Sequence, residues 1–381
     1  MIMPKYKFED IALNITQKRK PTIEDMETYI GLEHLDSGSL SILRWGSKVP
    51  IKGDKLIMQK GDVLFGKRNA YLRRASIAPH DGLFSAHGMV LRPNQNVILP
   101  KLFPFFICSD YFFDAAIRIS VGSLSPTINW SALKKLEFTL PNMDEQEKLA
   151  DILWAANDTK EQYKRLIYLT DELVKAQFTE MFGELGKDEH GWGLTTLGHC
   201  CELNPKRPQD ILDDTLVSFV AMPSVSENGD IDTSILKTYG EVRKGFTYFA
   251  ENDVLFAKIT PCMENGKGAI ATGLSSGIGA GSTEFYVLRP LKGVSNPFWL
   301  YIITMFESFR TNARKVMTGS GGQLRVPIGY LSEFPISLPP IELQNQFANF
   351  VKQANQSKVD LQQNLANLEI TIKALMSKNL G

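Results

Sequence analysis

"DEQEKLADIL" at residues 144–153 follows a strand-like ending, "LEFTLP" (136–141), and a similar exit recurs where "FPISLP" (334–339) runs into "IELQNQFANFV" (341–351). The two exits lie 198 residues apart. A short β-rich run that ends at Pro, followed by a long segment without Pro or Gly, is typical of a strand that leads into a helix. A chain that makes this transition twice is a candidate for an internal duplication.

The repeat extends upstream of the two exits. "KGDVLFGK" (60–67) matches "ENDVLFAK" (251–258), and "GMVLRP" (88–93) matches "FYVLRP" (285–290). The offset grows from 191 to 198 residues along the chain, as expected when loops are inserted between matched strands. A period of about 190 residues is too long for a solenoid repeat, so we predict two copies of one domain.

Each copy is predicted to be an α+β domain. Short β-rich runs such as "VLF" and "MVLRP" are broken by Gly, Pro and Asn, which favours antiparallel or mixed strands. Aromatic-rich stretches at 102–117 and 296–316 occupy matching places and are predicted to be helical, with their aromatic side chains in the core. The predicted organisation is a first globular domain (1–141), a central helical spacer (142–183), a second globular domain (184–339) and a C-terminal helical spacer (340–381).

The two spacers carry matched apolar seams at a 3-4 spacing, which is typical of a coiled coil. Since the second domain has to fit between the two helices, we predict that they pair antiparallel. Alternatively, each is an amphipathic helix that packs only on its own domain. The seam positions are Leu153, Ala156, Lys160, Tyr163, Ile167, Thr170, Val174 and Gln177 in the first spacer, and Val351, Ala354, Lys358, Leu361, Leu365, Leu368, Ile372 and Leu375 in the second.

The sequence offers no convincing catalytic site. Asp62 with Lys67, and Asp253 with Lys258, could suggest a metal nuclease, but neither motif holds a second carboxylate, and we interpret both aspartates as strand-end structure. "GIGAGS" (277–282) lacks the Gly-Lys-Ser/Thr ending of a phosphate-binding loop. The five histidines do not cluster in metal-binding spacing. We therefore expect a chain without catalytic activity, metal or cofactor.

Composition and charge distribution narrow the class of protein. The chain has no apolar run of membrane-spanning length and no signal-peptide pattern, and its four cysteines form no zinc or disulfide motif, so we expect a reduced, cytoplasmic protein with no membrane contact. The net charge is zero, yet residues 141–190 hold twelve acidic residues against six basic ones. The remainder therefore carries an excess of base, and a neutral protein can still present a basic face.

Polar and basic loops follow the matched strands. Cations can hold phosphates, whereas Arg and Asn can also read base edges, so both loops are candidates for DNA contact, although a solvated surface loop is the simpler alternative for either one alone. The candidates are Lys67, Arg68, Asn69, Tyr71, Arg73 and Arg74 in "GKRNAYLRR" (66–74), and Lys258, Asn265 and Lys267 in "AKITPCMENGKG" (257–268).

Together these features resemble the specificity subunit of Type I restriction-modification systems, over nearly the whole chain. The resemblance rests on "GWGLTTLGHCCELNPKR" (191–207), the "DVLF" strands, a Gly-Ser segment before each Leu-Pro exit, and the helix starts. It implies two target-recognition domains, each reading half of a bipartite site in double-stranded DNA, and helices that set the spacing. The copies differ in sequence where "VGSLSPTINW" (121–130) in the first corresponds to "TGSGGQLRVP" (318–327) in the second, so no single DNA contact can be transferred.

The resemblance also implies partners. The helices would dock methyltransferase subunits, expected in two copies and using S-adenosylmethionine, and restriction or translocase subunits could join them. Two other interpretations remain open. The chain could be the recognition subunit of another type of restriction-modification system with a separate catalytic chain, or a coiled-coil protein scaffold with no role in DNA binding.

Overall fold

The computed structural model of the chain describes residues 4–380, so residues 1–3 and 381, the outermost positions of the predicted ranges, lie outside the described residues. The chain divides into two compact units. The first comprises the residues up to Arg165 together with those from Gln362 onward, and the second comprises Leu166–Leu361. Both divisions fall inside long helices, α6 (Met143–Phe182) and α12 (Ile341–Leu380). Each helix therefore belongs partly to both units.

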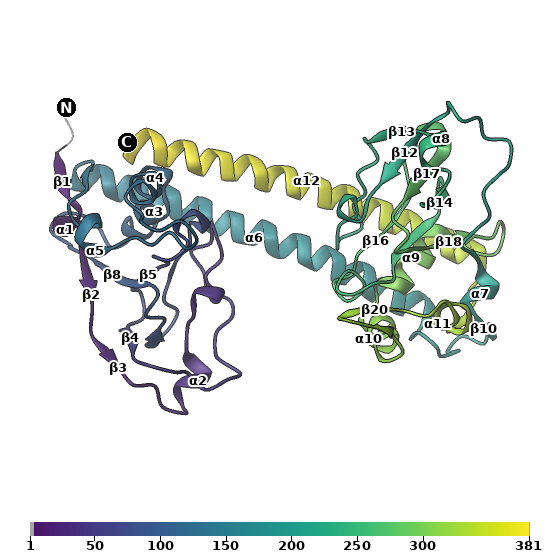
Figure 1. The fold of residues 1–381 in the computed structure, drawn as a ribbon, viewed down its shortest axis with the longest axis horizontal. Helices are drawn as coiled ribbons and strands as arrows, with labels where there is room; N and C mark the ends of the chain where they lie inside the picture. The colour runs from purple at the N-terminus through teal and green to yellow at the C-terminus, as the bar shows by residue number, and fades with distance from the viewer. Residues whose placement is uncertain (1–3, 381) are drawn as a thin grey trace. The chain divides into compact units, whose positions relative to one another are not determined.

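The first unit is an α+β domain built on a four-stranded antiparallel sheet in the order β2-β8-β5-β6, beside a three-stranded sheet in the order β3-β4-β7. Figure 1 shows these strands in the purple and blue part of the chain. The elements up to α6 are β1 Lys5–Lys7, α1 Phe8–Ile11, β2 Ala12–Ile15, β3 Lys18–Arg19, α2 Asp25–Thr28, β4 Lys55–Met58, β5 Val63–Phe65, β6 Ala75–Ile77, β7 Gly82–Phe84, β8 Met89–Pro93, α3 Phe103–Cys108, α4 Asp110–Arg118, α5 Trp130–Leu133 and β9 Glu137–Thr139.

The second unit repeats the same sheet, in the order β11-β18-β15-β16, and adds a second four-stranded sheet, β13-β12-β17-β14. This repetition confirms the duplication. Between α6 and α12 the elements are β10 Leu194–Thr196, α7 Leu197–Cys200, β11 Cys201–Leu203, β12 Leu216–Val220, β13 Leu236–Thr238, α8 Tyr239–Val242, β14 Thr247–Ala250, β15 Val254–Ala257, β16 Gly268–Ile270, β17 Ile278–Gly281, β18 Phe285–Pro290, α9 Pro297–Met305, α10 Glu307–Lys315, β19 Thr318–Ser320, β20 Gln323–Arg325, α11 Ile328–Glu333 and β21 Pro335–Ser337.

The repeated strand-to-helix exit is held by one glutamine in each copy. Gln146, on the first turn of α6, accepts from the Leu99 backbone N–H at 2.9 Å and donates to the carbonyls of Val97 and Pro141, both at 3.0 Å. The side chain is 1% exposed. Because a buried amide is stable only when its donors and acceptors are bonded, Gln146 fixes the direction in which the helix leaves the sheet.

Gln344 makes the same three bonds at the start of α12. It accepts from Asn296 N–H and donates to the carbonyls of Val294 and Pro339, each at 2.9 Å. In the first copy the helix start is reinforced by a capping box, in which Asn142 and Glu145 exchange side-chain to backbone bonds at 2.9 and 3.1 Å. The joint at each exit is therefore built from the helix start itself.

The two other repeated motifs, "DVLF" and "VLRP", each contribute one partner of an ion pair. Asp62, immediately before β5, binds Arg92 of β8 through two bonds of 2.6 and 3.0 Å, because β5 and β8 pair with Val63 opposite Leu91. Asp253 and Arg289 form the same pair in the second copy at 2.8 and 2.7 Å. Each aspartate also accepts the backbone N–H three residues before it. Both aspartates are thus structural, as the sequence indicated.

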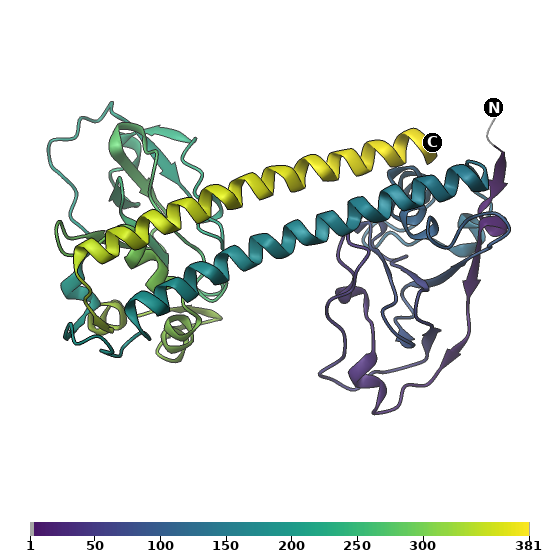
Figure 2. The same ribbon diagram turned by 180° about the vertical axis from the view of Figure 1, so that it is seen from behind.

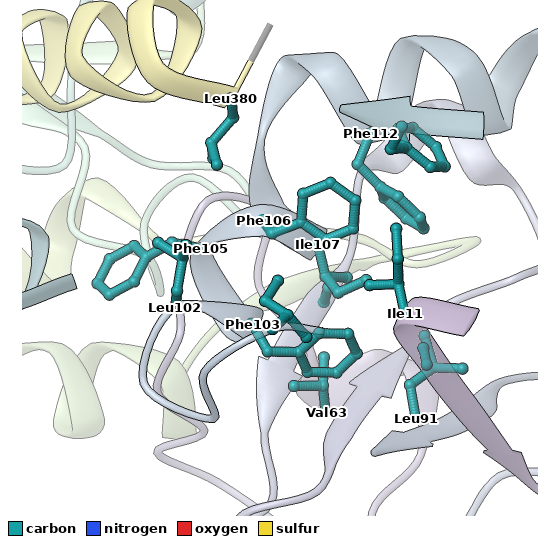
Figure 3. Packing of buried hydrophobic residues seen from close by; sticks show 14 of the residues in the cluster. Ile11, Val63, Leu91, Leu102, Phe103, Phe105, Phe106, Ile107, Phe112 and Leu380 are labelled. Atoms are coloured by element: carbon teal, nitrogen blue, oxygen red, sulfur yellow. The ribbon is translucent and has the colours of Figure 1, made fainter. Parts of the chain in front are cut away.

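Long helices α6 and α12 pair antiparallel inside each unit, which confirms the predicted pairing. In the first unit, Leu149 and Leu153 near the start of α6 share a core with Ile372 and Met376 near the end of α12. Figure 3 shows Leu380, at the end of α12, extending toward the side of this core that holds Phe105 and Phe106.

In the second unit the opposite ends of the two helices pack together. Phe178 and Phe182 near the end of α6 pack edge-on against Phe347 near the start of α12, with ring centroids 5.5 and 5.3 Å apart. Figure 2 shows the two helix ends beside one another in this unit. Every predicted seam position on both helices is buried or half-buried, whereas most intervening positions are exposed.

Aromatic stretches 102–117 and 296–316 each fold as two helices rather than one. The first breaks at Ser109, between α3 and α4, and the second breaks at Phe306, between α9 and α10. The Ser109 hydroxyl accepts from Phe112 N–H and so caps α4, whereas Phe306 makes no such bond. As expected, the rings lie in the core, where Phe106, Phe112 and Phe138 contact one another.

Candidate functional site

The first candidate loop, residues 66–74, connects β5 to β6 and is called here the first hairpin loop. Gly66 N–H donates to the Arg74 carbonyl at 2.8 Å and closes the loop. Asn69 and Arg73, with φ of 54° and 46°, adopt left-handed backbone at either side of a 3-10 turn. This turn leaves Arg68 and Tyr71 exposed, with Tyr71 58% accessible.

Lys67 lies in a pocket rather than on the open surface. The pocket, about 260 Å³ in volume, is also lined by Lys18, Asn14, Asn129 and Trp130. Burial lowers the pKa of Lys67, and the nearby charge of Lys18 lowers it further. Two ammonium groups that line one small pocket favour the binding of an anion, because an anion relieves both their repulsion and their lost hydration.

Two arginines of the first hairpin loop are bound by the protein itself. Arg73 forms ion pairs with both Asp110 and Asp114 of α4. The Arg74 guanidinium donates to the Leu32 carbonyl at 3.2 Å. These contacts position the loop against the domain and leave Arg68 as the more accessible cation beside Tyr71.

A second segment, the first turn (121–130), lies against this loop. Asn69 N–H donates to the Pro126 carbonyl at 2.8 Å, and Ile128 N–H donates to the Lys67 carbonyl at 2.9 Å. Leu124 at the tip is 95% exposed. The hairpin loop and the turn therefore form one continuous surface.

The second copy builds the same surface from residues 258–267, the second hairpin loop, and residues 318–327, the second turn. Val326 N–H donates to the Lys258 carbonyl at 2.9 Å, and Thr260 N–H donates to the Leu324 carbonyl at 2.9 Å. The Lys258 ammonium is half-buried and lies 4.7 Å from the ring centroid of Tyr286. Burial lowers its pKa, as it does for Lys67.

The side chains on the second surface differ from those on the first. Glu284 accepts three bonds from Arg325 of β20, the shortest 2.7 Å, and this pair adjoins Lys258. The bond to Arg325 lowers the pKa of Glu284. Asn265 is exposed at the loop tip, whereas the Lys267 ammonium turns inward to the Met222 carbonyl at 3.4 Å.

The structure thus places Lys67, Arg68, Asn69 and Tyr71 on the first hairpin loop and Lys258 and Asn265 on the second, while Arg73, Arg74 and Lys267 bond to their own domain. Sequence reasoning missed Lys18 and Arg325. Lys18 begins the basic run "KRK" (18–20), and Arg325 lies in the second turn, so both were visible but had no assigned neighbour. Only the fold places them beside the matched lysines.

Within residues 4–380, no group of three or more His, Cys, Asp or Glu side chains is arranged to hold a metal ion. None of the helices described there is long and apolar enough to span a membrane. The cysteines are free, and burial raises the pKa of Cys108 and Cys201 to about 12 and that of Cys200 to about 11.

Comparison with known families identifies the duplicated domain. The family model of the Type I restriction modification DNA specificity domain matches this chain twice, over residues 15–167 and 189–370. The chain belongs to this family. The two matches coincide with the two copies, and each includes one hairpin loop, one turn and part of a long helix.

Relatives in the specificity family agree with this assignment. The chain is 41% identical over 158 residues to the Type I restriction enzyme EcoAI specificity subunit of Escherichia coli, an alignment that covers 41% of this chain and only 26% of that subunit. A similar alignment, 40% identical over 152 residues, covers 39% of this chain and 25% of the E. coli EcoEI specificity subunit. The chain thus matches about a quarter of the length of these relatives.

A solved structure shares the fold over the full chain. It concerns complex assembly and conformational transition of the type I R-M system, and it matches with a TM-score of 0.58 at 17% identity, covering 100% of this chain and 98% of that one.

Proposed function

We propose that this protein is a DNA specificity subunit that reads a two-part site in double-stranded DNA. The observation that carries the proposal is the repetition of one loop-and-turn surface in both copies, each mounted through the same glutamine joint on a long helix. Two similar surfaces with different side chains suit two short half-sites of different base sequence, each called a word below. The family match supports this assignment.

The electrostatics of the surfaces fit contacts with a DNA backbone. Half-buried Lys67 and Lys258 occupy matching positions, and a phosphate would compensate the burial that lowers their pKa. The exposed side chains around them, Arg68 and Tyr71 in one copy and Asn265 in the other, can reach base edges. The lysines would then position the DNA, and the exposed side chains would read it.

We also propose that the helices carry partner subunits, which supply all chemistry. Helix α6 exposes an apolar stripe formed by Leu166, Leu169 and Leu173, each 45–53% accessible, on a face of the helix that flanks the seam. Such a stripe suits a methyltransferase subunit, expected in two copies and using S-adenosylmethionine, with restriction or translocase subunits as further partners. The chain itself would act in the cytoplasm and catalyse no reaction.

The test uses the chain co-purified with its methyltransferase partner, with methylated adenines mapped on genomic DNA. We expect a bipartite site with a fixed unread gap. Exchange of residues 184–339 for the equivalent domain of a relative should change one word only. Insertion of four residues between Glu172 and Leu173, about one turn of α6, should lengthen the gap by about one or two base pairs and leave both words intact. An insertion that rewrites a word, or an exchange that alters both, contradicts the proposal.

Salt dependence separates this function from that of a protein scaffold. A subunit that neutralises several phosphates loses affinity linearly with the logarithm of salt concentration. We expect this behaviour for the assembled complex on its mapped site. If the complex does not bind DNA, or binds it with an affinity that does not depend on salt, the scaffold is favoured.

A further inference from the structure

The first unit contains a large cavity, and two aromatic rings occupy part of the matching place in the second unit. It measures about 630 Å³ and lies among α4, α6, α12 and the segment around Gly38. Apolar side chains, including Leu40, Phe105 and Met376, share its lining with three polar residues that are more than nine-tenths buried, Ser109, Asn157 and Lys160. Ligand sites have this size and this mixture of apolar walls and few polar groups.

Two substitutions between the copies change which side chains occupy this place. Ser109 lines the cavity at the break between α3 and α4, and Phe306 occupies the matching break between α9 and α10. Met376 lies 198 residues after Phe178 and lines the cavity, whereas Phe178 packs on Phe306 with ring centroids 5.1 Å apart. In the second unit, two aromatic rings therefore stand where the first unit has Ser109 and Met376.

The buried charge differs between the copies in the same place. Lys358, which is 7% exposed, binds both carboxylate oxygens of Asp171 at 2.7 and 2.9 Å. Its counterpart Lys160 is equally buried but donates to the Gly38 carbonyl at 3.0 Å. Glu369 holds the position of Asp171 and lines the cavity, yet among residues 4–380 it forms no ion pair with Lys160. A buried ammonium has three donors, so Lys160 can serve a further acceptor.

From this comparison we infer that the cavity binds a small aromatic carboxylate. Its ring would take the place that the Phe306 ring fills in the second unit, and its carboxylate would bind Lys160 as Asp171 binds Lys358. The Asn157 amide lies beside Lys160 in the lining and can donate a further bond. The second unit thus serves as the template for the chemistry of the occupant. This inference does not depend on the proposed reading of DNA.

The mouth of the cavity is compatible with an anion. Lys164, Lys373 and Arg118 line it together with Asp110 and Asp114, but both aspartates already bind Arg73. Glu369 is the carboxylate that would oppose the ligand most directly, because it occupies the position of the partner that Lys160 lacks. Removal of its charge should therefore strengthen binding.

The test measures binding of 3-phenylpropanoate to the full-length chain by isothermal titration calorimetry. We expect a dissociation constant of about 1 mM or tighter and at least tenfold weaker binding of propanoate, which lacks the ring, and of 3-phenylpropanol, which lacks the charge. Lys160→Met should weaken binding at least tenfold, and Glu369→Gln should preserve or tighten it. Thermal unfolding of each variant verifies its fold.

Met376→Phe is the matched filling variant, since it introduces the residue that the second unit has at this position and leaves the Ser109 cap of α4 intact. It should abolish binding without loss of stability. Lys358→Met, in the second unit, serves as the control and should leave the affinity unchanged. An affinity that is the same in the wild type, Lys160→Met and Met376→Phe, or no saturable heat for the wild type at millimolar ligand, would overturn the inference.

Discussion

The two copies agree in their supports and differ in their surfaces. Both retain the buried Asp–Arg pair beside the central strand and the glutamine that locks the sheet to the helix. The loop-and-turn surfaces share backbone bonds but little else. In the first, Arg68 of the hairpin loop faces Thr127 of the turn, while in the second Ile259 of the loop faces Arg325 of the turn.

This difference shows which parts of the domain are free to vary. An ion pair or an amide that is buried with all its bonds made tolerates little change, because each lost partner leaves an unsatisfied group inside the protein. An exposed side chain on the hairpin loop or the turn, such as Arg68, carries no such constraint, since backbone bonds link the two segments whatever that side chain is. A duplicated domain can thus change what it recognises without changing how it is mounted.

The largest expected effect comes from breaking the ion pairs. Asp62→Ala and Asp253→Ala should each lower the free energy of unfolding by about 3 kcal/mol, the lower end for a buried pair, because the partner arginines keep 33% and 28% of their side-chain surface exposed. Hydrogen exchange of β5 in one variant and β15 in the other reports the loss unit by unit. Losses that differ widely would show that the two supports are not equivalent.

A smaller effect is expected at the helix joints. Gln146→Ala and Gln344→Ala each remove three hydrogen bonds and leave buried backbone groups without partners, which should cost about 2 kcal/mol. Chemical denaturation of each variant measures this cost. Gln146→Glu, which retains the acceptor for Leu99 but not the donors, should fall between the wild type and Gln146→Ala. Equal stability of all three proteins would contradict the role of the glutamine as a lock.

Sequence reasoning succeeded where local pattern decides the structure. The absence of Pro and Gly together with a 3-4 apolar spacing predicts α6 and α12 within one or two residues of their ends. The repeated "DVLF" and "VLRP" motifs were recognised, but their connection was not. Asp62 meets Arg92 only through the register of β5 on β8, which no spacing along the chain specifies.

The candidate DNA residues show the same limit. Arg73 looked as available as Arg68 in the sequence, but its partners Asp110 and Asp114 lie 37 and 41 residues further along the chain. Lys18 meets Lys67 across two sheets, and the sequence carries no sign of that encounter. Breaks in the aromatic helices were missed for a similar reason, because neither Ser109 nor Phe306 is a strong helix breaker and tertiary packing sets both positions.

The recognition surfaces differ in how freely their arginines can meet DNA. Arg68 is exposed, whereas Arg325 already binds Glu284. Arg68→Ala should therefore weaken binding of the assembled complex by about 1–3 kcal/mol if it reads a base, and Arg325→Ala should have the smaller effect. Fluorescence anisotropy on the mapped site and on sites with one altered word measures both. Arg73→Ala is the matched control, since its main expected loss is the anchor on α4. Normal binding by Arg68→Ala would mean that the hairpin loop is a solvated surface.

The smallest expected effect is a response of one surface to acid. Because the bond from Arg325 lowers the pKa of Glu284, this carboxylate stabilises the folded second turn above its unfolded pKa of about 4.3, and the contribution is lost as the pH falls through the lowered folded value. Positions 87 and 127, which match Glu284 and Arg325 in the first copy, are His and Thr, so no such pair exists there to be lost. Between about pH 5 and pH 3, hydrogen exchange of the β19–β20 amides, corrected for intrinsic rates, should quicken relative to that of the first turn. Glu284→Gln should remove the pH dependence. A quickening that persists in this variant would place the acid-sensitive group elsewhere in the second unit.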